Sequence, residues 1–199
     1  MLKKERPSPL SPDKMAIDRN AVYWFPMRVA FHHELRIREE LTRLDIEHYL
    51  PLKWEQRTYG GHLRRVQVPA MNIIFVHATK EDITRMKMYN EELAYLRYIK
   101  CCHPCITRKI YPSEIITIPH REMNSFIQAT EIDDERVCYL TYTDFLCKEG
   151  RKVRVIDGDF MGVEGEIKRI KKSRCVVVCL RGIAAVAIQV PFEHLEFIE

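Results

Sequence analysis

Hydrophobic and polar residues follow two different patterns along this chain, and the change comes near residue 150. Upstream, helical and strand-like periods alternate. Between residues 33 and 44, Ile37, Leu41 and Leu44 recur at helical spacing with charged residues between them, which predicts an amphipathic helix. Two further helices are predicted, over residues 80–89 and 121–129.

Strand-like segments lie between these helices. Residues 47–54 and 63–68 flank Tyr59-Gly60-Gly61-His62, a sequence typical of a β-hairpin turn. Residues 72–76 are almost wholly apolar and predict a buried central strand. Shorter strands are expected at residues 23–30, 93–99 and 115–118. This order predicts a mixed sheet covered by helices, an α+β architecture.

From residue 151 onward, every element is short, β-branched and bounded by turn residues. Five strands are predicted, at residues 152–156, 163–170, 174–180, 184–190 and 195–198. So many short strands in one small segment favour a closed β-barrel, which leaves no exposed sheet edge.

The chain therefore divides into four parts. Residues 1–20 contain three prolines among polar residues and predict a disordered tail. Residues 21–130 form the α+β domain, 131–147 a charged linker and 148–199 the barrel. The linker includes the apolar patch Val137-Cys138-Tyr139-Leu140, which we expect to dock onto one of the two domains.

Composition and charge favour a protein partner. The 199 residues carry 32 Lys/Arg and 28 Asp/Glu, a net charge of +4. Residues 1–20 contribute +2 (five against three) and residues 148–199 another +2 (ten against eight), so the middle is neutral. A stand-alone nucleic-acid binder usually has a larger excess of positive charge. Without a long apolar run or a signal peptide, the protein is expected in the cytoplasm, with no membrane contact.

The sequence offers little that is typical of catalysis. His32-His33 precede Glu34, but no nucleophile or Gly-rich phosphate loop accompanies them, so we expect neither an enzyme nor a cofactor. Seven cysteines, an odd number, do not suggest a disulfide framework. Cys101-Cys102-His103-Pro104-Cys105 is a single cluster, whereas structural zinc normally needs two paired ones, so reduced thiols are favoured over metal.

The sharpest motif is the strand–turn–strand sequence of residues 152–167. Its valines alternate with charged residues, and its glycines permit a tight turn and a bent second strand. It resembles the KOW motif of NusG-type factors and several ribosomal proteins. The residues that carry this resemblance are Val153, Val155, Asp157, Gly158, Phe160, Gly162 and Gly165.

The N-terminal half is also similar to NusG. Trp24-Phe25-Pro26-Met27-Arg28-Val29, residues 46–51 and residues 118–127 resemble the NusG N-terminal (NGN) domain. The resemblance is closest to the UpxY branch, Bacteroides NusG paralogues that act as antiterminators of capsular polysaccharide operons. It implies an NGN α/β sandwich followed by an SH3-like KOW barrel, in a protein that is monomeric when free.

The resemblance also implies partners. NGN domains bind the β′ clamp helices of RNA polymerase and bridge toward the β subunit, which opposes pausing. By position, the clamp-helix contact would comprise Trp24, Arg28, Ala70, Met71 and Ile73. The β-side contact would comprise Thr84, Arg85 and Met86, at the start of the second helix.

Several of these residues have alternative interpretations. Trp24 is suited to the core as well as to a binding surface. Arg57, Arg64 and Arg65 of the hairpin could face upstream DNA or only solvent. The basic run after the motif could contact nascent RNA, the ribosome or polymerase, or be a solvated turn. Its residues are Lys168, Arg169, Lys171 and Lys172.

Two departures from NusG matter for function. Ala70-Met71-Asn72-Ile73 stand where NusG has Phe-Pro-Gly-Tyr, so the pocket stays apolar without its ring. Arg181-Gly182-Ile183 stand where NusG has the Ile-Phe-Gly that engages Rho or ribosomal protein S10. Because a charge replaces an apolar anchor, Rho binding is not expected and S10 binding should weaken. The alternatives to an antiterminator are a general NusG that couples polymerase to Rho or the ribosome, and a KOW-bearing ribosomal or RNA-binding protein.

Overall fold

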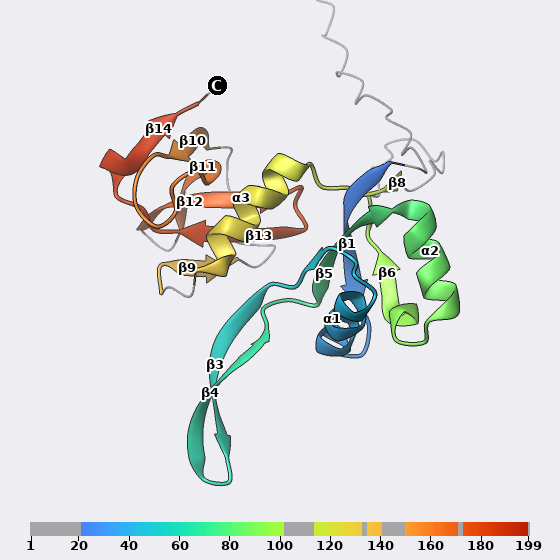
Figure 1. Cartoon of the computed structure of the whole chain (residues 1–199). Helices are drawn as coiled ribbons and strands as arrows, with labels where there is room; N and C mark the ends of the chain where they lie inside the picture. Colours follow the sequence, from blue (N-terminus) through green and yellow to red (C-terminus); the bar gives the residue numbers. More distant parts are fainter. Residues whose placement is uncertain (1–20, 102–113, 133–134, 141–149, 171–172, 199) are drawn as a thin grey trace, which may run out of the picture.

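The structure, a computed structural model, describes residues 21–101, 114–132, 135–140, 150–170 and 173–198 (Figure 1). Its N-terminal region is built on a four-stranded sheet in the order β2-β5-β1-β6. The strands are β1 (Val22–Val29), β2 (His48–Tyr49), β5 (Ile73–Thr79) and β6 (Leu96–Tyr98). The sequence predicts a mixed sheet, but every pair is antiparallel. Each helical crossover skips one strand, since β1 leads through α1 to β2 beyond β5, and β5 leads through α2 to β6 beyond β1. No parallel strands therefore become neighbours.

Two helices cover one face of this sheet. They are α1 (Glu34–Arg43) and α2 (Lys80–Tyr89), which confirms both predicted helices. Ile37 and Ile83 from the helices are fully buried with Ile74 and Val76 of β5. Thr79 caps α2, since its Oγ1 accepts a hydrogen bond of 3.0 Å from the backbone N–H of Asp82.

The third helix, α3 (His120–Glu131), covers the opposite face. Its Phe126 ring lies 5.7 Å from the ring of Phe75 in β5, and both are fully buried. Strand β5 is therefore buried on both sides, with Ile73 and Phe75 toward α3 and Ile74 and Val76 toward α1 and α2. The prediction of a central buried strand is confirmed.

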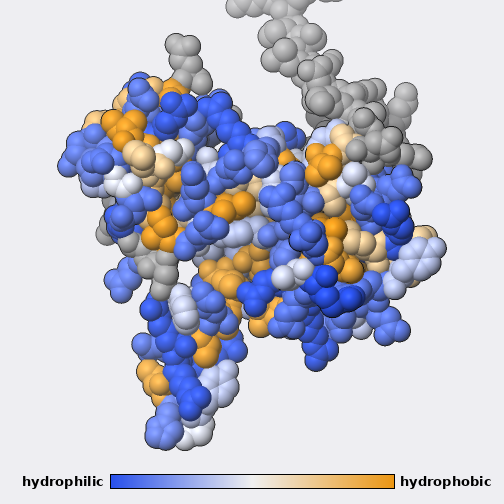
Figure 2. Space-filling view, in the orientation of Figure 1, coloured by the Kyte–Doolittle hydropathy of each residue, from blue (hydrophilic) through white to orange (hydrophobic). Residues whose placement is uncertain are grey.

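A long hairpin extends away from the body as an arm (Figure 1). Its strands are β3 (Leu52–Tyr59) and β4 (His62–Pro69), joined in eight antiparallel pairs. Gly60 and Gly61 both have positive φ, 57° and 81°, as the predicted Gly-Gly turn requires. Most side chains on the arm are exposed, and its visible surface is largely hydrophilic (Figure 2).

The predicted strand over residues 93–99 is only partly right, because it begins with the short 3₁₀ helix η1 (Leu93–Tyr95) before β6. The Asn90 side chain holds this turn: its Oδ1 accepts bonds from the N–H groups of Glu92 (3.0 Å) and Leu93 (3.2 Å). The small sheet of β7 (Lys100–Cys101) and β8 (Glu114–Ile115) follows. The expected strand at residues 115–118 is reduced to β8 and a bridge between Ile118 and Trp24.

The C-terminal region is an antiparallel sheet of six strands in the order β14-β10-β11-β12-β13-β9. Five match the predicted strands: β10 (Arg151–Val155), β11 (Glu164–Ile170), β12 (Ser173–Leu180), β13 (Ala184–Ile188) and β14 (Leu195–Phe197), the last preceded by η2 (Phe192–His194).

The sixth strand, β9 (Val137–Tyr139), comes from the predicted linker. Val137 and Tyr139 pair with Ile188 and Val186, so the apolar patch docks onto the C-terminal sheet. The sequence predicts a closed barrel of five strands. Instead, among the described residues, the order of strands ends at β14 and β9, which are not paired with each other.

The two regions are in contact through α3, which lies between the two sheets (Figure 1). One buried cluster runs from Phe75 through Phe126 to residues of the C-terminal sheet such as Val178 and Val186. Within the described ranges, no helix has the length and apolar character needed to cross a membrane.

Candidate interaction surfaces

The predicted clamp-helix residues gather on the face of the N-terminal sheet that α3 covers. Trp24 and Arg28 alternate along β1, and Arg28 pairs with Ile73 of β5, so these side chains share one face. Met71 is half-buried against the same cluster, and Ala70 is half-buried beside it. The structure thus brings this set together.

Solvent reaches only part of this set. Trp24 is 2% exposed, its ring stacks on His77 at 4.7 Å, and its Nε1 donates to His120 Nδ1 at 3.2 Å. Ile73 is also buried, whereas Arg28 is exposed. Of the two interpretations of Trp24, the core one describes its position here.

The predicted β-side residues lie in the middle of α2 rather than at its start, because the helix already begins at Lys80. Thr84 and Arg85 are exposed, and Arg85 pairs with Asp82 at 2.5 Å. Met86 is half-buried and packs toward the core between the sheet and the helices α1 and α2.

The three predicted arginines of the arm occupy both of its faces. Arg57 and Arg64 lie directly opposite each other, and Glu55 pairs with Arg57 at 3.1 Å. On the other face, the guanidinium of Arg65 lies 4.8 Å from the ring centroid of Trp54. The arm therefore presents an aromatic–cationic face and a charged face to solvent.

The KOW-like positions hold the C-terminal sheet together. Val153, Val155 and Phe160 are between 0% and 3% exposed. Gly158 has φ 84°, in the region that favours glycine. A Cβ on Gly165 would lie 2.6 Å from the carbonyl oxygen of Val177, so only glycine lets these strands approach so closely.

A family model described as the KOW motif matches residues 149–179. The C-terminal sheet carries a KOW motif. The match covers β10, β11 and most of β12, and the chain thus combines an N-terminal α/β region with an antiparallel KOW sheet. The motif indicates binding to nucleic acid, the ribosome or a transcription partner. No curated protein matches the chain significantly.

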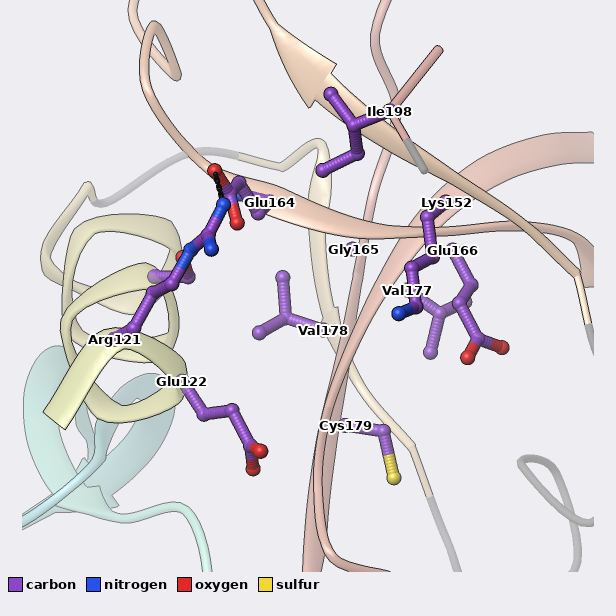
Figure 3. A pocket seen from close by; sticks show the side chains of 11 residues that line it. Arg121, Glu122, Lys152, Glu164, Gly165, Glu166, Val177, Val178, Cys179 and Ile198 are labelled. Carbon is purple, nitrogen blue, oxygen red and sulfur yellow. Dashed lines mark hydrogen bonds and ion pairs between the residues drawn. The ribbon is translucent and has the colours of Figure 1, made fainter. Parts of the chain in front are cut away.

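The KOW sheet meets α3 at an open hollow of about 300 Å³ (Figure 3). From α3, Arg121 reaches Glu164 of β11 at 2.6 Å, and Arg154 of β10 approaches the same carboxylate at 2.8 Å. Ser125 Oγ accepts a bond of 3.3 Å from the N–H of Glu164. Hydrogen bonding from Arg121, then from Arg154, lowers the pKa of Glu164 against the effect of burial.

The β12–β13 turn is the segment predicted to correspond to the apolar anchor loop of NusG. Arg181 lies in the β12–β13 turn with φ 47°, followed by Gly182 with φ 74°. Burial raises the pKa of Glu122 in α3, and the charge of Arg181 opposes this rise. The hollow therefore belongs to the contact between α3 and the KOW sheet, where residues of opposite charge meet.

The basic run does not form one uniform patch. Lys168 pairs with Glu166 at 3.1 Å and its side chain is only 9% exposed. Arg169 is exposed, and Lys171 and Lys172 lie outside the described residues. The solvated-turn interpretation is therefore inaccurate for Lys168, which is held within the sheet.

Sequence reasoning missed several contacts. Tyr139 of β9 donates a bond of 3.1 Å to the carbonyl of Leu52, at the root of the arm. The Tyr49 hydroxyl lies 2.6 Å from Thr130 Oγ1 of α3, and burial raises the pKa of Tyr49 to about 12. The only sequence feature that pointed to these contacts was Tyr139, the aromatic residue within the apolar patch of the predicted linker.

Three cysteine side chains lie among the described residues. Cys138, Cys175 and Cys179 are free. Within the described part of the chain, no three His, Cys, Asp or Glu side chains are placed to hold a metal ion. The segment 102–105, which holds most of the predicted cysteine cluster, lies outside that part.

Proposed function

We propose that this chain is a NusG-type transcription elongation factor that acts as an antiterminator. Its N-terminal region binds the β′ clamp helices of RNA polymerase and reaches toward the β subunit. Binding favours the closed clamp by differential affinity for that state, which suppresses pausing and termination in a long operon, such as one for capsular polysaccharide. No bond chemistry is involved.

The observation that carries the proposal is the KOW motif at residues 149–179, joined to an α+β region whose predicted polymerase-binding residues share one sheet face. Arg28 is the exposed member of that set, beside the half-buried Met71. Trp24 and Ile73 are covered in this conformation, so a partner that uses them must first displace part of the α3 and KOW packing.

Two other features support this role over a general NusG. The arm, whose strands contain Arg57, Arg64 and Arg65, extends away from the body, where a duplex could approach it (Figure 1). Arg181 stands where NusG has the apolar anchor for Rho or S10, is exposed, and lies close enough to α3 for its charge to act on Glu122. A charged side chain at this position is a poor anchor for an apolar site on another protein.

The test is single-round transcription in vitro through a terminator placed behind the operon leader. Added protein should raise read-through. The charge reversal R28E should raise the protein concentration that gives half of the effect about tenfold, because a charge-assisted contact contributes roughly 1.5–3 kcal/mol. Unchanged read-through on adding the natural protein would contradict the proposal.

The matched control is R36E on α1. Arg36 is exposed on the helix α1, which covers the face of the sheet opposite to the predicted clamp-helix contact. R36E should therefore retain full read-through. If R28E and R36E behave alike, the α3-side face is not the polymerase contact.

A further inference from the structure

Three arginines stand at one end of the KOW sheet, on the face whose buried residues belong to the cluster shared with α3. Arg151 precedes the buried Val153 by two residues in β10, and Arg174 precedes the buried Val176 by two in β12. Arg169 lies directly opposite Arg174. Because alternate residues of a strand share a face, these arginines lie on the same face as the buried valines but are exposed at the end of the sheet.

An aromatic pair lies beside them. The rings of Phe192 and Phe197 are 6.1 Å apart, and the side chains are 53% and 41% exposed. The guanidinium of Arg151 lies 4.0 Å from the Phe197 centroid, and that of Arg174 lies 5.6 Å from Phe192. This end of the sheet thus presents stacked cations and exposed rings together.

The charges at this end differ from those at the α3 end of the sheet. Among the residues that the structure describes, no carboxylate forms an ion pair with Arg151, Arg169 or Arg174. Arg169 and Arg174 also face each other across the ladder, an arrangement of like charges that destabilises a sheet. By contrast, Arg121 and Arg154 at the α3 end share the carboxylate of Glu164.

We infer that this end of the KOW sheet, the Arg–Phe platform (Arg151, Arg169, Arg174, Phe192 and Phe197), binds single-stranded nucleic acid. The arginines lie on three neighbouring strands and so span about 10 Å, which matches an extended anionic backbone rather than a single ion. Bases stack on aromatic rings and on guanidinium planes regardless of sequence.

The chemistry favours a single strand over two other anionic partners. A duplex hides its base faces, so the exposed phenylalanines would gain nothing from it. An acidic peptide would satisfy the arginines but has no planar groups for the rings. The inference goes beyond the proposed function, because it holds for the free protein with no polymerase present.

The experiment measures binding of the full chain to a fluorescent oligouridylate of about ten nucleotides by anisotropy, over a range of salt. Three phosphate contacts predict a slope of log K against log salt of about −2. R169Q and R174Q should each reduce that slope by roughly 0.7. F192A should weaken binding about tenfold and leave the slope unchanged. The oligodeoxyuridylate of the same length tests whether the 2′-hydroxyl contributes.

The controls separate this platform from general positive charge. R36Q on α1 and F31A, at the exposed Phe31, should bind as the natural protein does. F197A should weaken binding as F192A does. If F197A folds poorly, F197L keeps an apolar side chain without the aromatic ring and should still weaken binding. Equal loss in R36Q, or competition by an oligoglutamate of equal length, would overturn the inference.

Discussion

The arm and the β12–β13 hairpin have turns that share one backbone feature but lie in opposite surroundings. Each reverses through two consecutive residues of positive φ, Gly60-Gly61 in the arm and Arg181-Gly182 in the KOW sheet. The arm has eight cross-strand pairs and is mostly exposed. The KOW hairpin has five pairs, with buried side chains on both faces.

The difference shows where stability comes from in this protein. Backbone pairing is more extensive in the arm, yet an isolated two-stranded hairpin is marginal in water. The KOW hairpin is shorter but lies between two buried clusters, one shared with α3 and one that contains Cys175 and Ala187. The arm is thus suited to contacting a partner, and the KOW hairpin to holding the fold.

The strongest test of this contrast replaces one leucine in each hairpin by alanine. Leu180 of β12 is 0% exposed and Leu63 of β4 is 65% exposed. L180A should lower the free energy of unfolding by about 2–5 kcal/mol, through lost burial and a cavity. L63A should change it by less than about 0.5 kcal/mol. Urea unfolding gives both values, and similar losses would refute the contrast.

A smaller effect is expected at the turns. Gly182 has φ 74° and Gly61 has φ 81°, and a Cβ added at either glycine would meet no atom within 4 Å. Alanine at either site therefore meets only backbone strain of about 1–2 kcal/mol. G182A should lower global stability by that amount. G61A should leave it unchanged, because the arm tip can relax without unfolding the core.

Amide exchange of the arm strands provides the control for the turn variants. G61A should speed exchange near Tyr59 and His62, while urea unfolding stays as in the natural protein. A fall in global stability for G61A equal to that of G182A would show that the arm is part of the cooperative unit.

The smallest effect concerns pH at the root of the arm. Burial raises the pKa of Tyr49 from 10.0 to about 12. The unfolded chain therefore ionises this phenol first, and stability falls as pH rises from 10 toward 12. At pH 11 the loss should be about 1 kcal/mol relative to pH 9. Y49F should lose this component, so the difference between the two unfolding curves measures it.

Local rules in the sequence were enough for much of this fold. The spacing of Ile37 and Leu41 predicts α1, and the Gly-Gly pair predicts the arm turn, because each depends on neighbours in the chain. The KOW positions are of the same kind: Val153 and Val155 alternate inward, and Gly158 occupies a positive φ.

Other features depend on contacts between distant residues and could not be predicted. Residues 137–139 become a sixth strand only because Ile188 and Val186 offer an unpaired edge. The pairing of Arg121 with Glu164 joins helix and sheet across 43 positions, one choice among many exposed charges. The alternation along β1 was enough to predict that Trp24 and Arg28 share a face of the sheet. The burial of Trp24 under α3 was not predictable, because it depends on tertiary packing.

The attachment of β9 to the KOW sheet shortens the connection between the two regions. Strand β9 is held by three residue pairs at the edge of the KOW sheet. Val137 is the β9 residue nearest to α3 along the chain. Release of β9 would leave the other five strands in their ladder and lengthen the connection by about 10 Å. The connection between the two regions thus stores a short, defined length of slack, which becomes available once α3 has separated from the KOW sheet on which it packs.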